Sequence, residues 1–350
     1  MTAVRVVVVG AGVVGLLTAL ECALAGHRVT VLDRGPIPNP AASSADQHRA
    51  LRTLVVGNPA ATRRLVRAER RWRELERLLG TPFYRRVGVV TAWPAERVEA
   101  VLRSAAAAGL PVAPVGPGEL APLGLPPGST GLREQAAGVL LARRVLRALA
   151  GRLAGHPAVT LRPRTAVTAV RPADGLLETA GGERIGGDLV LLAAGPWTRE
   201  LVAEPVLLHR QTVVYLRPPA RLARWWHGVG AVGGLGRDGR GWALPPVGGT
   251  LLKVSSHTLC REVAGTGLAG EDQAGWAERL VGEGLLREAG EYAVVGVRAC
   301  HYTSDAGTGG ARLTRLGPGL WARSACGGSG FAAAPLVADR IVRAAAEAAA

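Results

Sequence analysis

The chain has 350 residues, of which 48% are hydrophobic, and this is enough apolar sequence for a full core, most simply in two domains. Its longest apolar run, residues 6–20, is too short and too broken by glycine to span a bilayer, and no basic leader precedes it. We therefore expect a cytoplasmic protein without membrane contact. The four cysteines are scattered along the chain, which argues against a zinc site or a disulfide framework.

The net charge of +15 raises the question of nucleic-acid binding. The arginines, however, are mixed with acids, as in TRRLVRAERRWRELERLL, where they form the solvent side of an amphipathic helix. The sequence has no basic patch interleaved with aromatics and no recognition-helix motif. We do not expect a nucleic-acid partner, and attraction of anionic substrates is the milder alternative.

The N-terminal part of the chain reads as a strand, a glycine turn, a helix and a second strand. Residues 4–9 are almost wholly apolar and β-branched, which is typical of a strand buried on both faces. The run GAGVVG follows, and apolar residues 13–24 continue as a helix closed by Gly26. Residues 27–32 predict the second strand, and Asp33 lies at its carboxyl end.

Each part of this unit has a role in binding a dinucleotide. Gly10 permits the tight turn, Gly12 lets a pyrophosphate approach the backbone, and Gly15 lets the helix pack closely on the strand. The helix N-terminus offers free N–H groups to the phosphates. Asp33 follows Gly10 by 23 residues, where its carboxylate can accept from the ribose hydroxyls. The expected cofactor contacts here are Gly10, Ala11, Gly12, Val13, Val14, Gly15, Asp33 and Arg34.

The segment SSADQHRALR follows the second strand. Ser43 and Ser44 are candidate helix N-caps. Arg49 and Arg52 are three residues apart, so in a helix they would project from one face. Such arginines are often only solvated, but directly after a cofactor strand they could face a cofactor or a substrate carboxylate.

Of the 42 lysines and arginines, a single residue, Lys253, is lysine. Arginine is a permanent charge, whereas lysine can be neutralised or can act as a compact donor inside a site. Either a site requires a lysine at this position, or Lys253 is a chance exception in a composition that otherwise uses arginine. Composition alone leaves both interpretations open.

Buried strands that run into glycine turns and helices occur in three blocks, 1–84, 138–204 and 297–350. Two other segments, 85–137 and 205–296, separate the blocks, and the second alternates like antiparallel strands. This arrangement predicts an α/β fold in which a nucleotide-binding domain is interleaved with a substrate domain built on a mixed or antiparallel sheet. Among the individual elements, we expect helices at 59–80, 142–153 and 271–289, a strand at 85–93, and a glycine-rich connection after residue 217.

Several separated motifs, taken in order, resemble flavin-dependent amine oxidases of the D-amino-acid oxidase superfamily, of the monomeric sarcosine oxidase and N-methyltryptophan oxidase type. These motifs are GAGVVG with Asp33, SSADQHRALR, LLKVSSH, ACHYTSD and CGGSGF. The resemblance implies a Rossmann-like FAD-binding domain. It places Ser43, Ser44, Val167, Ala194, Gly195, Trp197, Gly327, Gly328, Ser329, Gly330 and Phe331 at the cofactor.

The resemblance also implies roles for the expected active-site residues. Arg49 would lie against the flavin ring, and Arg52 would bind a substrate carboxylate. Lys253 would activate oxygen, with His257 as an active-site histidine. Two residues of ACHYTSD complete the set: Cys300 would form a thioether to the flavin, and Tyr302 would lie on the substrate side.

Two departures from the family pattern bear on the substrate. The family's C-terminal turn carries a lysine after its phenylalanine, as a second clamp on the substrate carboxylate, whereas this chain has Ala332. A histidine-containing run of the family is here Ser43-Ser44-Ala45. We therefore expect a bulkier or neutral amine, or a biosynthetic intermediate, in place of simple sarcosine.

The implied reaction is a two-electron oxidation of a C–N bond, with FAD as the cofactor, an imine as the product and oxygen reduced to hydrogen peroxide. Two alternatives remain at this point. One is an FAD-dependent dehydrogenase that passes electrons to a partner instead of oxygen. The other is a nicotinamide-dependent dehydrogenase, which would leave the three-block layout and CGGSGF unexplained.

Overall fold

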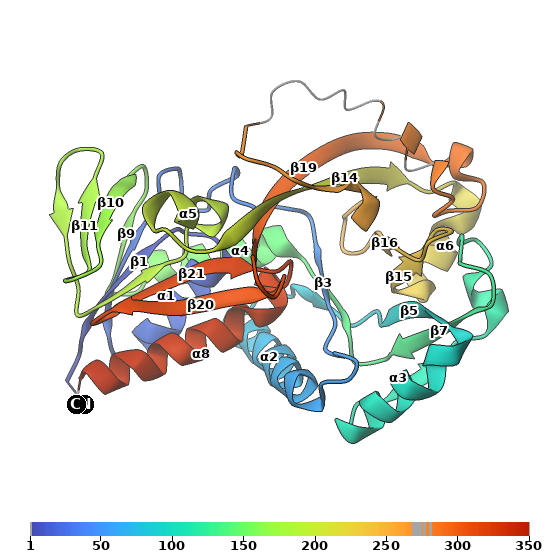
Figure 1. The fold of residues 1–350 in the computed structure, drawn as a ribbon, viewed down its shortest axis with the longest axis horizontal. Helices are drawn as coiled ribbons and strands as arrows, with labels where there is room; N and C mark the ends of the chain where they lie inside the picture. Colours follow the sequence, from blue (N-terminus) through green and yellow to red (C-terminus); the bar gives the residue numbers. More distant parts are fainter. Residues whose placement is uncertain (1, 268–274, 276–277, 280–281, 350) are drawn as a thin grey trace.

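The computed structural model describes residues 2–267, 275, 278–279 and 282–349, and it arranges them around two large β-sheets (Figure 1). The first sheet has six strands in the order β20-β21-β13-β1-β2-β9, and all its neighbours are parallel except β20 and β21. Its strands come from three separate blocks of the chain, as the sequence predicted. They are β1 (Arg5–Val9), β2 (Arg28–Leu32), β9 (Val159–Arg162), β13 (Leu189–Leu192), β20 (Ala311–Gly317) and β21 (Leu320–Cys326).

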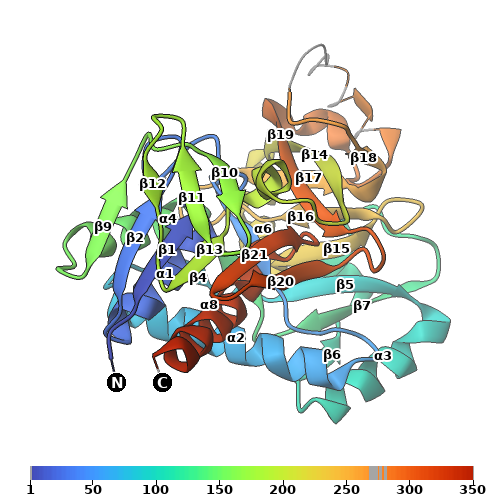
Figure 2. The ribbon, with the colours of Figure 1, turned by 60° about the vertical axis from the view of Figure 1, so that its left-hand side comes forward.

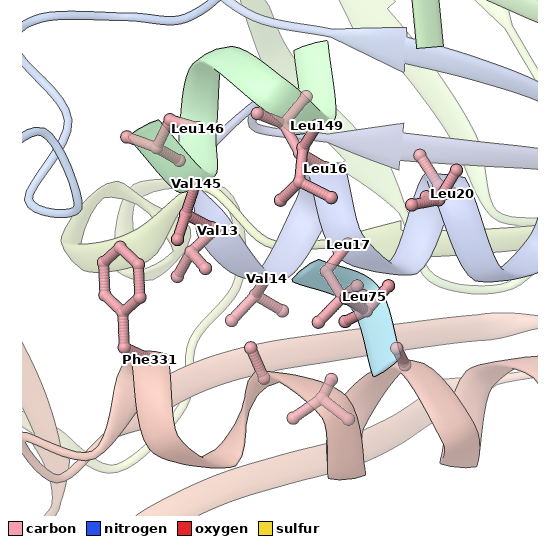
Figure 3. Packing of buried hydrophobic residues seen from close by; sticks show 14 of the residues in the cluster. Val13, Val14, Leu16, Leu17, Leu20, Leu75, Val145, Leu146, Leu149 and Phe331 are labelled. Carbon is pink, nitrogen blue, oxygen red and sulfur yellow. The ribbon is translucent and has the colours of Figure 1, made fainter. Parts of the chain in front are cut away.

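Helices cover one face of this sheet, and a small sheet covers the other (Figure 2). The helical side comprises α1 (Val13–Leu24), α2 (Pro59–Leu78), α4 (Ala142–Ala154) and α8 (Gly330–Ala348). Their apolar side chains interdigitate in one buried cluster, because each helix is hydrophobic along the stripe that faces the sheet (Figure 3). The other face is covered by α5 (Thr198–Leu201) and the antiparallel strands β10 (Val167–Arg171), β11 (Leu176–Thr179) and β12 (Arg184–Ile185).

The second sheet has nine strands. Eight follow the order β18-β14-β17-β16-β15-β5-β7-β6, and β19 pairs with β14. Figure 1 shows β14 and β19 as two long strands that arch side by side across the molecule. The strands are β5 (Val89–Pro94), β6 (Val112–Pro114), β7 (Ser129–Glu134), β14 (Val206–Arg217), β15 (Ala231–Leu235), β16 (Gly241–Leu244), β17 (Leu252–Ser256), β18 (Cys260–Glu262) and β19 (Ala293–Asp305).

A small antiparallel sheet, β3-β8-β4, corrects one expectation. We expected a helix that projected Arg49 and Arg52 from one face, but Arg49–Leu51 is strand β3, and it pairs with β8 (Gly138–Leu140), which also pairs with β4 (Tyr84–Arg85). Pairing with a segment some ninety residues away outweighs the local helical pattern, and the serines before it favour turns. Arg52 follows the strand, so the two arginines are not held on one face of a helix, although both line the cavity described below.

Three further differences concern single elements. The glycine-rich connection contains an unexpected helix, α6 (Ala220–Val229), which buries Trp226; the alanine-rich helix α3 (Ala95–Ala107) of segment 85–137 is not one of these differences. The strand predicted at 85–93 is split into β4 and β5. Short 3-10 turns occur at Pro117–Leu120, Gly195–Trp197, His257–Leu259 and Ala289–Glu291.

Of the helix predicted at 271–289, residues 271–274, 276–277 and 280–281 lie outside the described residues; residues 275, 278–279 and 282 are helical, but residues 283–289 are not α-helical, and Leu286 forms a β-bridge with Leu123. Within the part of the chain that is described, no helix is both long and apolar enough to cross a membrane. The division into two domains remains our proposal. β19 crosses the boundary that we placed at residue 297, because it pairs with β14 along its whole length.

Candidate active site

One cavity of about 1130 Å³ runs from the glycine turn after β1 to the inner face of the nine-stranded sheet. This volume is large for a pocket that holds one small ligand, and it leaves room for a cofactor and a substrate together. All the predicted site residues line the cavity except Ala11 and Gly15, which lie behind its wall. The lining includes Lys253, Arg49, Arg52, His257, Tyr302 and Cys300 from segments far apart in the sequence.

The glycine turn has the geometry that the motif predicts. Gly10 has φ +103°, and a Cβ there would lie 2.5 Å from the carbonyl oxygen of Ala193. A Cβ on Gly15 would lie 1.8 Å from the carbonyl oxygen of Gly10, so the helix packs against the turn only without a side chain. Gly12 instead faces the cavity, where a Cβ would meet only Ser44 Oγ at 3.0 Å. The backbone at Gly12 is therefore open to a ligand.

Asp33 lies at the end of β2 and holds the turn in place. Its carboxylate accepts hydrogen bonds from the backbone N–H of Ala11 and of Gly35 and from Asn39 Nδ2, each at 2.8 Å. Three of its roughly four acceptor positions are thus occupied by protein donors. The remaining position, on the oxygen that accepts from Ala11, can receive one ribose hydroxyl. Asn39 was missed by the sequence analysis.

An arginine and a tryptophan flank the end of the cavity at the first glycine turn. The Arg34 guanidinium lies 3.9 Å from the centre of the Trp197 ring, which follows Ala194 and Gly195 after β13. Trp197 Nε1 donates to Thr266 Oγ1 at 3.2 Å, so the indole orientation is fixed. Val167 of β10 lines the same region.

A second glycine turn, between β21 and α8, meets the cavity from the opposite direction. Gly327 and Gly328 have φ of +54° and +76°, and a Cβ on Gly328 would meet nothing within 4 Å. The first turn of α8 follows at Ser329 and Gly330, with no side-chain cap on its N–H groups. Phe331, the next residue, stacks on Trp72 in the core and anchors the helix. A hydrogen-bond acceptor in the cavity can therefore approach the exposed backbone N–H groups of this turn.

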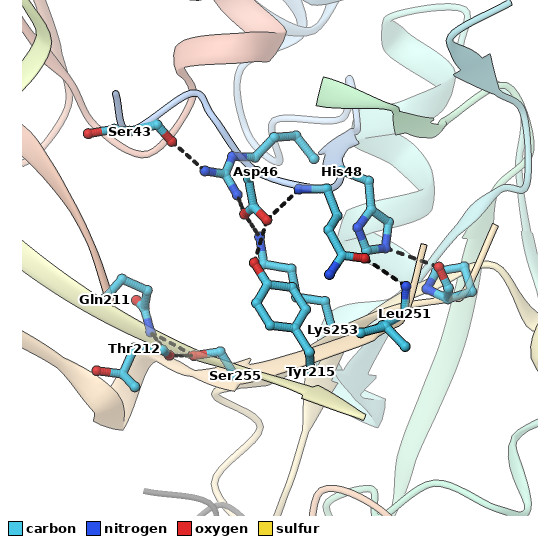
Figure 4. Close-up of polar contacts among 12 residues, drawn as sticks. Ser43, Asp46, His48, Gln211, Thr212, Tyr215, Leu251, Lys253 and Ser255 are labelled. Atoms are coloured by element: carbon cyan, nitrogen blue, oxygen red, sulfur yellow. Dashed lines mark hydrogen bonds and ion pairs between the residues drawn. The ribbon is translucent and has the colours of Figure 1, made fainter. Parts of the chain in front are cut away.

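Between the two sheets lies a buried polar cluster formed by Asp46, Arg49, Tyr215 and Lys253 (Figure 4). Lys253 Nζ donates to Asp46 Oδ2 at 2.6 Å, and both side chains are 3% exposed. Arg49 and the Tyr215 hydroxyl also bond to this carboxylate, and Arg49 further donates to the carbonyl oxygen of Ser43 at 2.6 Å. The sequence analysis placed Arg49 and Lys253 in a site but missed Asp46 and Tyr215.

The charges in this cluster shift each other's pKa. Burial and the nearby Arg49 guanidinium lower the pKa of Lys253 to about 8, although Asp46 opposes the shift. Burial alone would raise the pKa of Asp46, but Arg49 and Lys253 outweigh it and hold that pKa far below its ordinary range. Burial raises the pKa of Tyr215, and the Asp46 charge adds to this effect. At neutral pH the cluster therefore holds two cations and one anion.

Strand β19 brings Cys300 and Tyr302 to the cavity. The Tyr302 ring stacks on His209 with 5.1 Å between ring centres, and its hydroxyl lies 3.3 Å from Cys260 Sγ. Cys300 is partly exposed and close enough to Lys253 to interact with it electrostatically.

At the end of the cavity away from the glycine turns, positive side chains predominate. Arg52, Arg237 and Arg240 line this end, and none of them forms an ion pair with a carboxylate of the described residues. Because Gly241 pairs with Ser256, Arg240 lies beside His257. Partial burial lowers the pKa of His257, and the charges of Arg240 and Arg52 lower it further. This end of the cavity suits an anionic group.

The residues present fit a bound flavin nucleotide. Two glycine turns offer open backbone to phosphates and to an acceptor edge, as described above. In addition, Arg323 of β21 is 8% exposed, lines the cavity, and its Nε has no hydrogen-bond partner within the described chain. A buried cation with an unsatisfied donor is costly, so the position of Arg323 is best explained by an anionic group in the cavity.

The chain belongs to the FAD dependent oxidoreductase (DAO) family, whose sequence profile matches residues 5–344. It is an FAD-dependent oxidoreductase, which excludes the nicotinamide-dependent alternative. Glycine oxidase from Pseudomonas aeruginosa is 77% identical over 31 residues, a match that covers 9% of this chain and only 8% of that enzyme.

Solved structures of oxidases share the fold. A modified fructosyl peptide oxidase from Aspergillus nidulans has a TM-score of 0.79 at 18% identity, covering 97% of this chain and 90% of that one. NikD, described as an unusual amino acid oxidase essential for nikkomycin biosynthesis, has a TM-score of 0.78 at 21% identity, covering 99% and 95%. Amadoriase I from Aspergillus fumigatus, a fructosyl amine:oxygen oxidoreductase, has a TM-score of 0.77 at 16% identity, covering 99% and 87%.

Proposed function

We propose that this protein is an FAD-dependent oxidase of an amine or amino acid, which oxidises a C–N bond to an imine and reduces oxygen to hydrogen peroxide. The observation that carries the proposal is the Lys253 ammonium, buried on the wall of the cavity between the two sheets. The similar folds of an amino acid oxidase and of two amine or peptide oxidases support it.

The overall reaction removes two electrons and two hydrogens from the C–N bond, and oxygen takes up both. FAD, held by the two glycine turns, would supply the hydride acceptor and the route for the electrons to oxygen. Lys253 and Arg49 contribute fixed positive charge that stabilises negative charge as it develops on oxygen in a water-poor site. Tyr302 and His257, on neighbouring walls of the same cavity, would orient the amine.

The substrate end of the cavity favours an amine that also carries an acidic group. Arg52 and Arg240 offer two guanidinium groups, each of which can bind a carboxylate through two parallel hydrogen bonds. We therefore propose an amino-acid-like substrate whose carboxylate is held by arginines of the nine-stranded sheet and its neighbours.

Cys300 is the proposed attachment point of the flavin. Forming this thioether would require loss of the thiol proton, a flavin hydrogen and two electrons, for which oxygen, reduced to peroxide, would be the acceptor. Acid precipitation of the purified protein should leave a yellow pellet, and Cys300→Ser should release the flavin into the supernatant. Complete extraction of flavin from the parent would exclude the bond and leave the rest of the proposal intact.

A substrate screen tests the function directly. Under nitrogen, the flavin absorbance should bleach with amino acids or secondary amines that carry a carboxylate, and on admission of air it should return with one peroxide per turnover. Bleaching without peroxide would indicate a dehydrogenase that uses a partner acceptor. If amines of every class leave the flavin oxidised, the amine-oxidase proposal is wrong.

A further inference from the structure

Asp46 is placed where it controls Lys253. Within the described part of the chain it is the only acid that pairs with Lys253, and the two atoms in contact, Nζ and Oδ2, are 2.6 Å apart. The carboxylate comes from the loop after the first sheet, whereas Lys253 is in β17 and Tyr215 is in β14 of the other sheet. The pair therefore spans the boundary between the sheets (Figure 4).

The residues that follow Asp46 fix its position. Gln47 Oε1 accepts from the backbone N–H of Leu251 at 2.7 Å, and His48 Nε2 donates to the carbonyl oxygen of Pro245 at 3.0 Å. Three consecutive residues thus bind three points along β17 and the turn before it. Asp46 has little freedom to move away from Lys253.

The other groups that face Lys253 would not keep its amine charged. Arg49 is a second cation, and His48 is neutral at physiological pH, because burial and the Lys253 charge lower its pKa to about 4. Trp242, whose ring centre is 5.5 Å from Nζ, and Cys300 contribute weaker attractions. Asp46 is the only full negative charge in direct contact with the amine in the described structure.

We propose that Asp46 is a positioning residue that keeps the Lys253 amine protonated and directed at the cavity. This inference deepens the proposed function. Its effect on the reoxidation rate rests on that proposed function, whereas its effect on the protonation of Lys253 does not. Without the carboxylate, Lys253 would stand beside Arg49 in a buried site, and both burial and the like charge favour the neutral amine. Loss of one close opposite charge lowers a lysine pKa by about 1–3 units, so the amine would be largely neutral at physiological pH.

The single lysine makes this proposal directly measurable. The purified flavoprotein, labelled with 13C- and 15N-lysine, gives one side-chain signal, which can be titrated from about pH 5 to pH 10 by NMR. We expect the parent amine to titrate with a pKa of about 8. In Asp46→Asn the midpoint should fall by about 1–3 units. Tyr215→Phe, which removes one hydrogen bond to Asp46 but no charge, should shift it much less.

An Asp46→Asn variant that folds and titrates like the parent would overturn the proposal. If Asp46→Asn does not fold, the parent and Asp46→Glu still test the proposal. The proposal requires that Lys253 is protonated at pH 7 in both proteins. A neutral amine in the parent refutes it. As the pH rises, the rate of reoxidation by oxygen should fall, and the midpoint of this fall should lie at a lower pH in Asp46→Asn than in the parent. If oxygen proves not to be the acceptor, the kinetic difference vanishes while the NMR shift persists, so the two failures are distinguishable.

Discussion

The two ends of the cavity are built by different means. At the nucleotide end, the site is built from backbone: glycines create open turns, and α1 and α8 begin there without a side-chain cap from their own N-cap residues. At the substrate end, the site is built from charged side chains of separate elements: Asp46 pairs with Arg49 and Lys253, and Arg240 also lines the cavity. At the first end, Gly10 and Gly15 leave no room for a side chain, whereas the second end depends on the balance of charges. Mutations at the two ends should therefore fail in different ways.

The largest effect is expected at Lys253. Lys253→Met removes the fixed charge nearest to the developing anion, so reoxidation by oxygen should slow by about 100-fold or more, because a few kcal/mol of electrostatic stabilisation is lost. Reduction by substrate should change much less. Lys253→Arg keeps a charge but spreads it over a planar group, so only partial rescue is expected. Stopped-flow mixing of reduced enzyme with oxygenated buffer measures the step. Reoxidation of the Met variant at the parent rate would leave Lys253 without a catalytic role.

Substitutions of glycine at the nucleotide end should reduce stability through steric overlap. Gly15→Ala places a Cβ 1.8 Å from the Gly10 carbonyl oxygen, so we expect a loss of about 1–3 kcal/mol of stability, together with weaker FAD binding. Gly151→Ala in α4 is the matched control, since nothing lies within 4 Å of its Cβ and alanine favours a helix by about 1 kcal/mol. Urea unfolding compares the two variants. Equal stability of both would contradict the close approach of α1 to β1.

Arg323 tests whether the nucleotide end also uses charge. Arg323→Gln removes a buried cation that has no protein partner at its Nε, so FAD affinity should fall by about tenfold, the loss of one charge-assisted contact. The measurement belongs in a Cys300→Ala background, where a covalent bond cannot mask the change. If the variant is more stable to unfolding than the parent and binds FAD equally well, Arg323 contacts no part of the cofactor.

The smallest effect is expected from Arg52→Lys. A lysine keeps the charge but cannot form two parallel hydrogen bonds to a carboxylate, so the apparent substrate KM should rise about fivefold, with FAD binding unchanged. Arg240→Lys should act in the same way if both arginines hold the acid group. An unchanged KM in both variants would indicate a substrate without a carboxylate.

The geometry of the first glycine turn could be predicted from the sequence, because its requirements are local. Gly10, Gly12 and Gly15 are fixed by spacing along one strand and helix, and the structure places them as expected. The interleaving of blocks was also predictable, since each block repeats the pattern of a buried strand, a turn and a helix.

The substrate end could be predicted only in part. Lys253 stood out as the only lysine, but Asp46 lies in a segment for which we expected a helix and which the structure shows as a loop before β3. Its role depends on contacts with Tyr215 and Lys253, about 170 and 200 residues away, which no local pattern encodes. Likewise, α6 was missed because the glycines after it suggested a loop, whereas burial of Trp226 stabilises the helix.

The long pairing of β14 with β19 has a consequence for unfolding. The two strands pair from Val206 with Asp305 to Arg217 with Ala293, with one register shift after Tyr215, and β19 also packs against β21 of the other sheet. The contact of β19 with β21 couples the nine-stranded sheet to the six-stranded sheet. Heating should therefore produce one cooperative transition, in which the calorimetric and van't Hoff enthalpies agree, although the chain is built on two sheets.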